Sequence, residues 1–200
     1  MDQLAAVCEN IASHGSRLKK VAIVAEYLRA LDDDDLVRAV RFLCCVPVAG
    51  MEGEVNLFGQ EHARKLSVGY VVLRQAALAA TGWDEDTYRL CHREVGDTGE
   101  TICLLLRREQ VRTPMPLARA EELYRELYRS RRTADKISIL QTCFLQHQPL
   151  AIKYFVKMIT GDLRIGLQWK QVEEAVAAAT GVPLDDVRDA LAEAGCEVEQ

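Results

Sequence analysis

The 200-residue sequence lacks several features that would assign it to a membrane, secreted or metal-binding class. No segment approaches the roughly 20 uninterrupted apolar residues of a membrane helix. The start carries Asp2 and Glu9 and no basic stretch, so we expect no export signal. The seven cysteines are scattered without a C-x-x-C pair, which favours reduced thiols in a cytoplasmic protein. We therefore expect no membrane partner and no structural metal.

Aromatic residues are also few, at 6%, but hydrophobic residues reach 49%, enough for a buried core. The formal net charge is −5, whereas a nucleic-acid-binding domain is usually basic. The charge is unevenly spread, because the stretch from Arg129 to Lys170 holds eight Lys or Arg and only two acids, Asp135 and Asp162. The sequence therefore allows one positive patch on an otherwise acidic body.

The hydrophobic pattern predicts an all-α domain of about 9–12 helices, extending over residues 1–200 as a single domain. We expect the run 46–65, which contains proline and glycine, to be a long loop with at most a short helical piece. The apolar run 101–106 fits either a strand or a short buried helix. Helices are expected at 18–31, 36–43, 66–80, 84–95, 117–129, 136–145, 150–159, 169–179 and 185–194.

Two parts of the chain align with each other. K-V-A-I-V at 20–24 matches K-I-S-I-L at 136–140, and L-S-V-G at 66–69 matches L-R-I-G at 163–166. Further on, T-G at 81–82 matches T-G at 180–181. The pattern predicts internal repeats at roughly 13–100 and 117–198, and hence a pseudo-twofold domain.

The segment 153–167 is the most informative part of the sequence. It predicts a helix with Lys153 and Lys157 on one face, ending at Gly161, then a turn that presents Arg164 and leads into a helix near Gln168. Free amides at a helix N-terminus and a glycine-rich turn bind phosphate oxygens, and the lysines could add charge. The alternative is a capping glycine, a connecting turn and a surface arginine, which helical proteins often contain.

K-Y-F-V-K-x-I followed by G-D-L-R-I-G-L resembles the N-terminal DNA-binding domain of ATP-dependent DNA ligases, and the likeness extends over about 13–194. The resemblance implies an all-helical, pseudo-twofold domain that lies along the minor groove of nicked duplex DNA in repair, replication and recombination. Asp162 departs from the family, which often has a basic residue there, and so does the segment 194–197. The implied DNA contacts are Gly161, Arg164, Gly166 and Gln168, and more weakly Ser67 and Gly69.

A second phosphate contact is open at the start of the first repeat, where Arg17, Lys19 and Lys20 follow the candidate helix caps Ser13 and Ser16. It would be equivalent to Thr133 and Lys136 in the second repeat. The alternative is a solvated, basic helix start.

The chain contains no K-x-D-G sequence, whose lysine carries AMP in the ligase reaction of the family it resembles. We therefore expect no catalytic residue, and no activity from this chain alone. ATP and Mg²⁺ are expected only for the catalytic nucleotidyltransferase and OB domains of the parent protein, which are absent here. The expected partners are nicked double-stranded DNA and those catalytic domains. The alternative is a helical scaffold that binds a protein partner, which the negative net charge favours.

Overall fold

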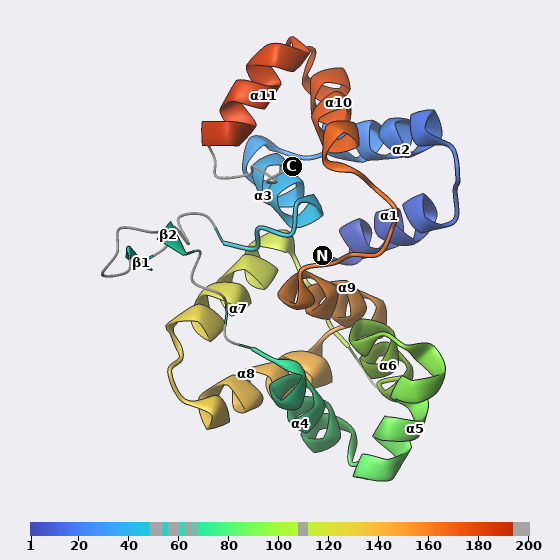
Figure 1. The fold of residues 1–200 in the computed structure, drawn as a ribbon, viewed down its shortest axis with the longest axis vertical. Helices are drawn as coiled ribbons and strands as arrows, with labels where there is room; N and C mark the ends of the chain where they lie inside the picture. The colour runs from blue at the N-terminus through green and yellow to red at the C-terminus, as the bar shows by residue number, and fades with distance from the viewer. Residues whose placement is uncertain (49–53, 56–60, 63–65, 67, 108–111, 194–200) are drawn as a thin grey trace. The chain divides into compact units, whose positions relative to one another are not determined.

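The computed structural model describes residues 1–48, 54–55, 61–62, 66, 68–107 and 112–193. Regular structure in these ranges is almost entirely helical, so the predicted all-α class is confirmed (Figure 1). The one exception is an antiparallel pair of two-residue strands, β1 (Glu54–Val55) and β2 (Glu61–His62). The helices are α1 (Asp2–Ala12), α2 (Arg17–Arg29), α3 (Asp33–Leu43), α4 (Tyr70–Thr81), α5 (Glu85–Val95), α6 (Thr98–Leu105), α7 (Leu117–Arg129), α8 (Thr133–Gln146), α9 (Pro149–Thr160), α10 (Trp169–Thr180) and α11 (Leu184–Glu193).

Local sequence signals locate most of these helices. Asp32 and Asp84 precede α3 and α5, and each side chain accepts the amide of the third residue that follows it, as an N-cap does. Gly82 and Gly181 end α4 and α10 in the left-handed conformation. None of the helices in the described ranges is long and apolar enough to cross a membrane.

The structure decides one open alternative and differs from the sequence predictions at three places. The run 101–106 is helical rather than a strand: residues 101–105 lie in α6, whose N-cap Asp97 accepts the Glu100 amide at 2.8 Å, and Leu106 is the C-cap. Helix α4 begins at Tyr70 rather than at residue 66. The described residues of the 46–65 loop include the strand pair rather than a helical piece. Helix α1 was not predicted.

The helices group into two compact units. Unit 1 comprises residues 1–5 and 65–161, and unit 2 comprises residues 6–64 and 162–200. Unit 1 therefore contains α4 to α9 and the start of α1, while unit 2 contains the rest of α1 with α2, α3, α10 and α11.

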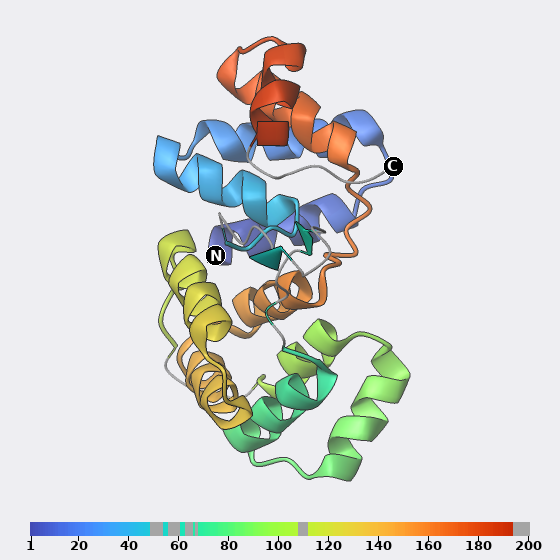
Figure 2. The same cartoon turned by 60° about the vertical axis from the view of Figure 1, so that its left-hand side comes forward.

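The core of unit 1 is built around aromatic side chains. Tyr124 of α7 stacks on Phe155 of α9 with ring centroids 4.3 Å apart, and its hydroxyl donates to the Phe155 carbonyl oxygen at 3.0 Å. Helix α4 packs against α8, and α6 packs against α9 (Figures 1 and 2). Tyr88, Phe144 and Ile102 are fully buried.

In unit 2, α2 packs against α10 (Figures 1 and 2). Val24 and Leu28 of α2 and Val172 and Ala175 of α10 are buried, and Phe42 of α3 adds the largest fully buried ring. The Arg29 guanidinium donates to the Ala178 carbonyl oxygen at 2.8 Å.

Each unit combines a part of both predicted repeats. The α2–α10 pair of unit 2 and the α4–α8 pair of unit 1 each join one helix from residues 13–100 to one helix from residues 117–198. Ala79, which aligns with Ala178, likewise accepts a side-chain hydrogen bond across the helix pair, from Gln141 at 3.0 Å. The two acceptors align, but the donors Arg29 and Gln141 do not, so the duplication stays a prediction.

Candidate nucleic-acid interface

The chain leaves α9 through a left-handed glycine. Gly161 has φ +80°, a conformation that residues with a Cβ rarely adopt, and its amide donates to the Lys157 and Met158 carbonyl oxygens. In unit 2 the chain continues with alternating burial, since Leu163 and Ile165 are buried while Asp162, Arg164 and Gly166 are exposed. The two apolar side chains thus hold the segment 162–166 on the unit and leave its polar positions in solvent.

Arg164 has a left-handed backbone conformation that residues other than glycine rarely adopt. Its φ is +53°, which costs a non-glycine residue roughly 1–2 kcal/mol. The Asp162 carboxylate stabilises this bend by accepting the Arg164 amide at 2.8 Å, and it also lies 3.5 Å from the guanidinium Nε. The Arg164 side chain is 56% exposed. It is therefore not locked inside the protein, and solvent can replace its exposed contact with Asp162.

Lys20 of α2 lies beneath the same turn. Its ammonium donates to the carbonyl oxygens of Ile165 at 2.9 Å and Gly166 at 2.7 Å, and the residue is only 8% exposed. A Cβ at Gly166 would lie 2.8 Å from the lysine Nζ, and φ at this glycine is +60°. The positive φ favours glycine at 166, and a Cβ there would also displace the Lys20 ammonium from its two carbonyl contacts. The sequence alternative of Lys20 as a direct phosphate contact is wrong, because the ammonium points inward.

Gln168 caps the start of α10. Its amide donates to the Gln171 side-chain oxygen at 2.6 Å, and the residue is exposed. The first turn of α10 follows Gly166 closely, and the Gln171 amide donates to the Gln168 carbonyl oxygen at 2.9 Å, which leaves the Trp169 and Lys170 amides without a partner among the described residues. This is the arrangement in which helix amides bind an anion.

Arg17 lies in the same unit, at the start of α2. Ser16 caps this helix, whereas the Ser13 hydroxyl donates to the Asn10 carbonyl oxygen of the preceding helix. The Arg17 guanidinium pairs with Glu174 of α10, but its side chain is 60% exposed. Arg17 is thus reachable from solvent, with its charge already partly neutralised.

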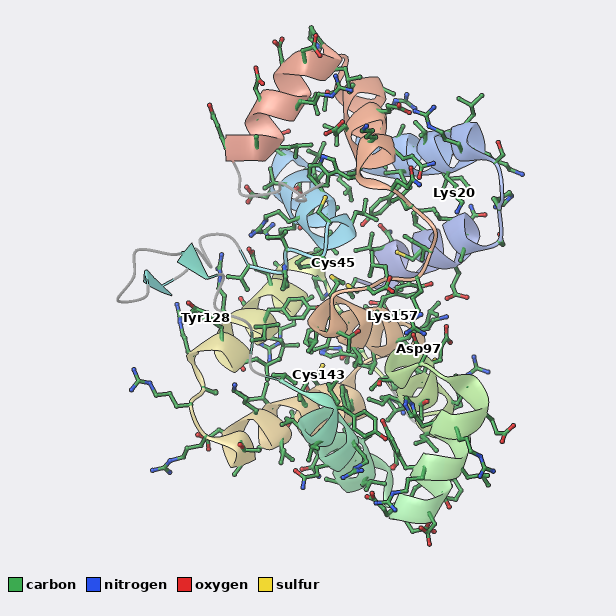
Figure 3. The ribbon with its side chains drawn as sticks, in the orientation of Figure 1. Lys20, Cys45, Asp97, Tyr128, Cys143 and Lys157 are labelled. Atoms are coloured by element: carbon green, nitrogen blue, oxygen red, sulfur yellow. The ribbon has the colours of Figure 1, made fainter. Side chains whose placement is uncertain are left out.

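Lys153 and Lys157 do not join this surface. They are 7% and 4% exposed because α9 packs against α6 on the face that carries them. Lys153 Nζ lies 2.7 Å from a Glu100 carboxylate oxygen, and Lys157 Nζ lies 3.2 Å from a carboxylate oxygen of Asp97 (Figure 3). The prediction that both lysines contact phosphate is corrected, since reaching solvent would break buried ion pairs.

In unit 1, the segment that aligns with the turn leads into α4. Gly69 is the N-cap of this helix and is exposed, with nothing within 4 Å of a Cβ built on it. Ser67 lies outside the described residues. Lys136 of α8 donates from Nζ to the Leu66 carbonyl oxygen at 2.9 Å, so a buried lysine supports this segment as well. In the internal alignment Leu66 matches Leu163, so this carbonyl does not correspond to that of Ile165 or Gly166.

The end of α7 and the connection to α8 carry three exposed arginines, namely Arg129, the last residue of α7, and Arg131 and Arg132 after it. No described residue forms an ion pair or hydrogen bond with their guanidinium groups. The sequence suggested a single positive patch from Arg129 to Lys170 that includes these arginines. Because Lys136, Lys153 and Lys157 are buried, the exposed positive charges do not form one continuous patch. The structure leaves these three as a separate basic loop, here called the arginine loop.

Comparison with known proteins places the chain in a family. A sequence model described as DNA ligase N terminus matches residues 1–177. The chain belongs to this family. Similar proteins include probable DNA ligases of Opitutus terrae (28% identical, covering 92% of this chain and 21% of that protein) and Koribacter versatilis (30% identical, 95% and 31%). A DNA ligase of Methanoculleus marisnigri is 31% identical, over 88% of this chain and 32% of that protein. The chain thus spans about a fifth to a third of the relatives it matches.

The match to the DNA ligase N-terminal family includes both turn segments, because they lie within residues 1–177.

The sequence analysis did not recognise the supporting role of Lys20 and Lys136. The sequence did contain a signal for this role. The internal alignment pairs Lys20 with Lys136, and each lies in the first turn of its helix, α2 or α8. Among the described residues no three His, Cys, Asp or Glu side chains gather as metal ligands.

Proposed function

We propose that this chain binds nicked duplex DNA through the sugar-phosphate backbone at the minor groove, without regard to base sequence. In this role it would hold the nick for the catalytic domains of an ATP-dependent DNA ligase. The observation that carries the proposal is the exposed turn 162–168 in a member of the DNA ligase N-terminal family, where Arg164 and the start of α10 lie side by side.

The chemistry of this turn suits a phosphate rather than a base edge. Backbone amides and an arginine fork donate hydrogen bonds, and they read charge and geometry instead of base identity. An arginine also fits a narrow minor groove, where the negative potential is strongest. The proposed contacts in unit 2 are therefore Arg164, Gly166 and Gln168, with Arg17 at their edge.

The charge distribution supports the same function for unit 1. This unit holds fifteen Lys or Arg against twelve Asp or Glu, whereas unit 2 holds ten against eighteen. The arginine loop, at the start of α8, offers three charges that no carboxylate in the described residues neutralises. We propose that it adds phosphate contacts to those of Gly69 at the start of α4.

The ligase reaction itself belongs to the rest of the parent protein in this proposal. ATP and Mg²⁺ would be used there, since the chain has no K-x-D-G lysine to carry AMP. The same proposal implies roles in DNA repair, replication and recombination. It also implies that the protein acts in the compartment that holds the DNA.

The test is a salt titration of binding to nicked duplex, followed by fluorescence anisotropy. With roughly 4–8 phosphate contacts, log affinity should fall against log salt with a slope of about −0.9 per contact. Arg164→Ala should weaken binding by about 1–2 kcal/mol to the same extent on unrelated sequences. Arg188→Ala is the control, because this exposed arginine of unit 2 lies on α11 and pairs with Glu173 and Asp185.

One observation favours a second function, a helical scaffold for a protein partner. The acidic surplus of unit 2 would repel a polyanion unless the positive groups are concentrated at the contact. A scaffold would bind nicked duplex without a steep salt dependence, or not bind it at all. The same titration therefore separates the two functions.

A further inference from the structure

Lys20 is a buried positive charge without a carboxylate partner among the described residues. Its ammonium has two recorded contacts, the carbonyl oxygens of Ile165 and Gly166. By contrast, the buried lysines Lys153 and Lys157 each meet a carboxylate, whereas Lys136 donates to the Leu66 carbonyl oxygen. A buried ammonium satisfied only by neutral dipoles is unfavourable for folding.

The two carbonyl contacts fix the direction of two amides. Each peptide unit is planar and trans, so its C=O and N–H groups point in opposite directions. Because the Ile165 and Gly166 carbonyls point down to Lys20, the amides of Gly166 and Leu167 point away from it. In the described part of the chain neither amide donates a hydrogen bond. Lys20 thus turns two unpaired donors outward, next to the start of α10 and beside Arg164.

We propose that Lys20 is a positioning residue for phosphate binding at the turn 162–168. It orients the Gly166 and Leu167 amides toward the anion and does not touch the phosphate itself. This inference rests on the proposed function and adds the residue that sets the geometry of that surface.

The variant Lys20→Met tests the proposal, because methionine keeps the length of the side chain and removes both the charge and the donors. The matched control is Arg188→Met, which removes an exposed charge of the same unit on α11 and makes the same change in net charge. We expect Lys20→Met to lower affinity for nicked duplex by about tenfold and Arg188→Met by about threefold or less. Equal effects of the two substitutions would overturn the proposal.

The salt dependence separates positioning from direct contact. A residue that touches phosphate changes the slope of log affinity against log salt by about 0.9, whereas Lys20→Met should leave the slope unchanged. A positioning role also predicts coupling with Arg164→Ala. Once the turn has lost its support, removal of the arginine should weaken binding less than it does in the parent chain. A changed slope, or independent effects of the two substitutions, would show that Lys20 does not position the turn.

Circular dichroism would reveal whether Lys20→Met folds. If it does not fold, a measurement on the unaltered chain still tests the proposal. The backbone amide signals of Gly166 and Leu167 should shift in NMR spectra on addition of nicked duplex, and shift less with inorganic phosphate alone. If the chain binds the duplex and these two signals stay in place, the amides do not face the anion and the inference fails. If the chain binds no duplex at all, the proposed function fails instead.

Discussion

Replacement of Arg129, Arg131 and Arg132 by serine should reduce DNA affinity mainly through counterion release. All three side chains are exposed, and none meets a carboxylate in the described residues. Their charges are therefore available to phosphates at no cost in broken ion pairs. Serine keeps the loop polar, and no buried contact of α7 or α8 is lost.

The expected magnitude follows from the number of charges. Each phosphate contact adds about 0.9 to the slope of log affinity against log salt, so loss of three contacts should reduce the slope by about 2.7. At 0.1 M salt this term is worth about one power of ten per contact. The triple variant should therefore bind nicked duplex about 10²–10³-fold more weakly at that salt, and the difference should shrink as salt is raised.

The assay is fluorescence anisotropy with labelled nicked duplex at several salt concentrations. The matched control replaces Arg89, Arg93 and Arg119 by serine, which makes the same change in net charge within unit 1. Each of these arginines already pairs with a glutamate, so their loss should alter the slope little. Equal slopes for the parent and the triple arginine-loop variant would refute the reasoning, as would equal effects of the two triple variants.

Three further predictions concern stability and thiol chemistry. Asp97→Ala should lower the free energy of unfolding in urea by about 3–5 kcal/mol, because it removes the N-cap of α6 and the carboxylate that pairs with the buried Lys157. Asp32→Ala is the control, since it removes an N-cap alone and should lower the free energy of unfolding several-fold less. Gly99→Ala should cost about 1–3 kcal/mol in the same assay, because its Cβ would lie 2.7 Å from a backbone oxygen of α9, and an unchanged midpoint would contradict that packing. Burial raises the pKa of the Cys45 thiol to about 11, so its thiolate fraction, and with it the alkylation rate in the folded chain, should rise about tenfold per pH unit from pH 8 to pH 10. Alkylation of Cys45 at pH 8 as fast as in the urea-unfolded chain would contradict this.

Local signals were sufficient to predict most of the helices. Asp32 at the start of α3 and Gly82 at the end of α4 act through their own backbone neighbours, so their effects can be read without a fold. The start of α4 was misplaced because residues 66 and 68–69, although apolar or small, form the segment that leads into the helix. The residue at which α4 begins depends on packing against α8, and hydrophobic periodicity carries no information about that packing.

The candidate surface was only partly predictable for the same reason. The turn at 161–166 has a sequence signature, since glycines flank a short segment between two helices, and the structure places it where the pattern predicts. The spacing of Lys153 and Lys157 indicated a common helix face, which is correct, but not that α6 covers that face. A lysine pair at i, i+4 has the same sequence pattern whether the partner is a phosphate or a buried carboxylate.

The pairing of helices from different repeats links the two predicted halves of the chain in a specific way. Lys20 supports a turn 145 residues further along, and Lys136 supports a segment 70 residues before it. In both units the lysine belongs to one repeat and the turn to the other, so neither repeat contains a complete turn with its support. A duplication that produced this arrangement had to keep the lysine and the turn in both copies, because loss of either in one repeat would disturb the surface formed with the other. If the chain arose by duplication, this requirement would explain why the two lysines stand at aligned positions in an internal match that is otherwise made mainly of apolar residues and glycines.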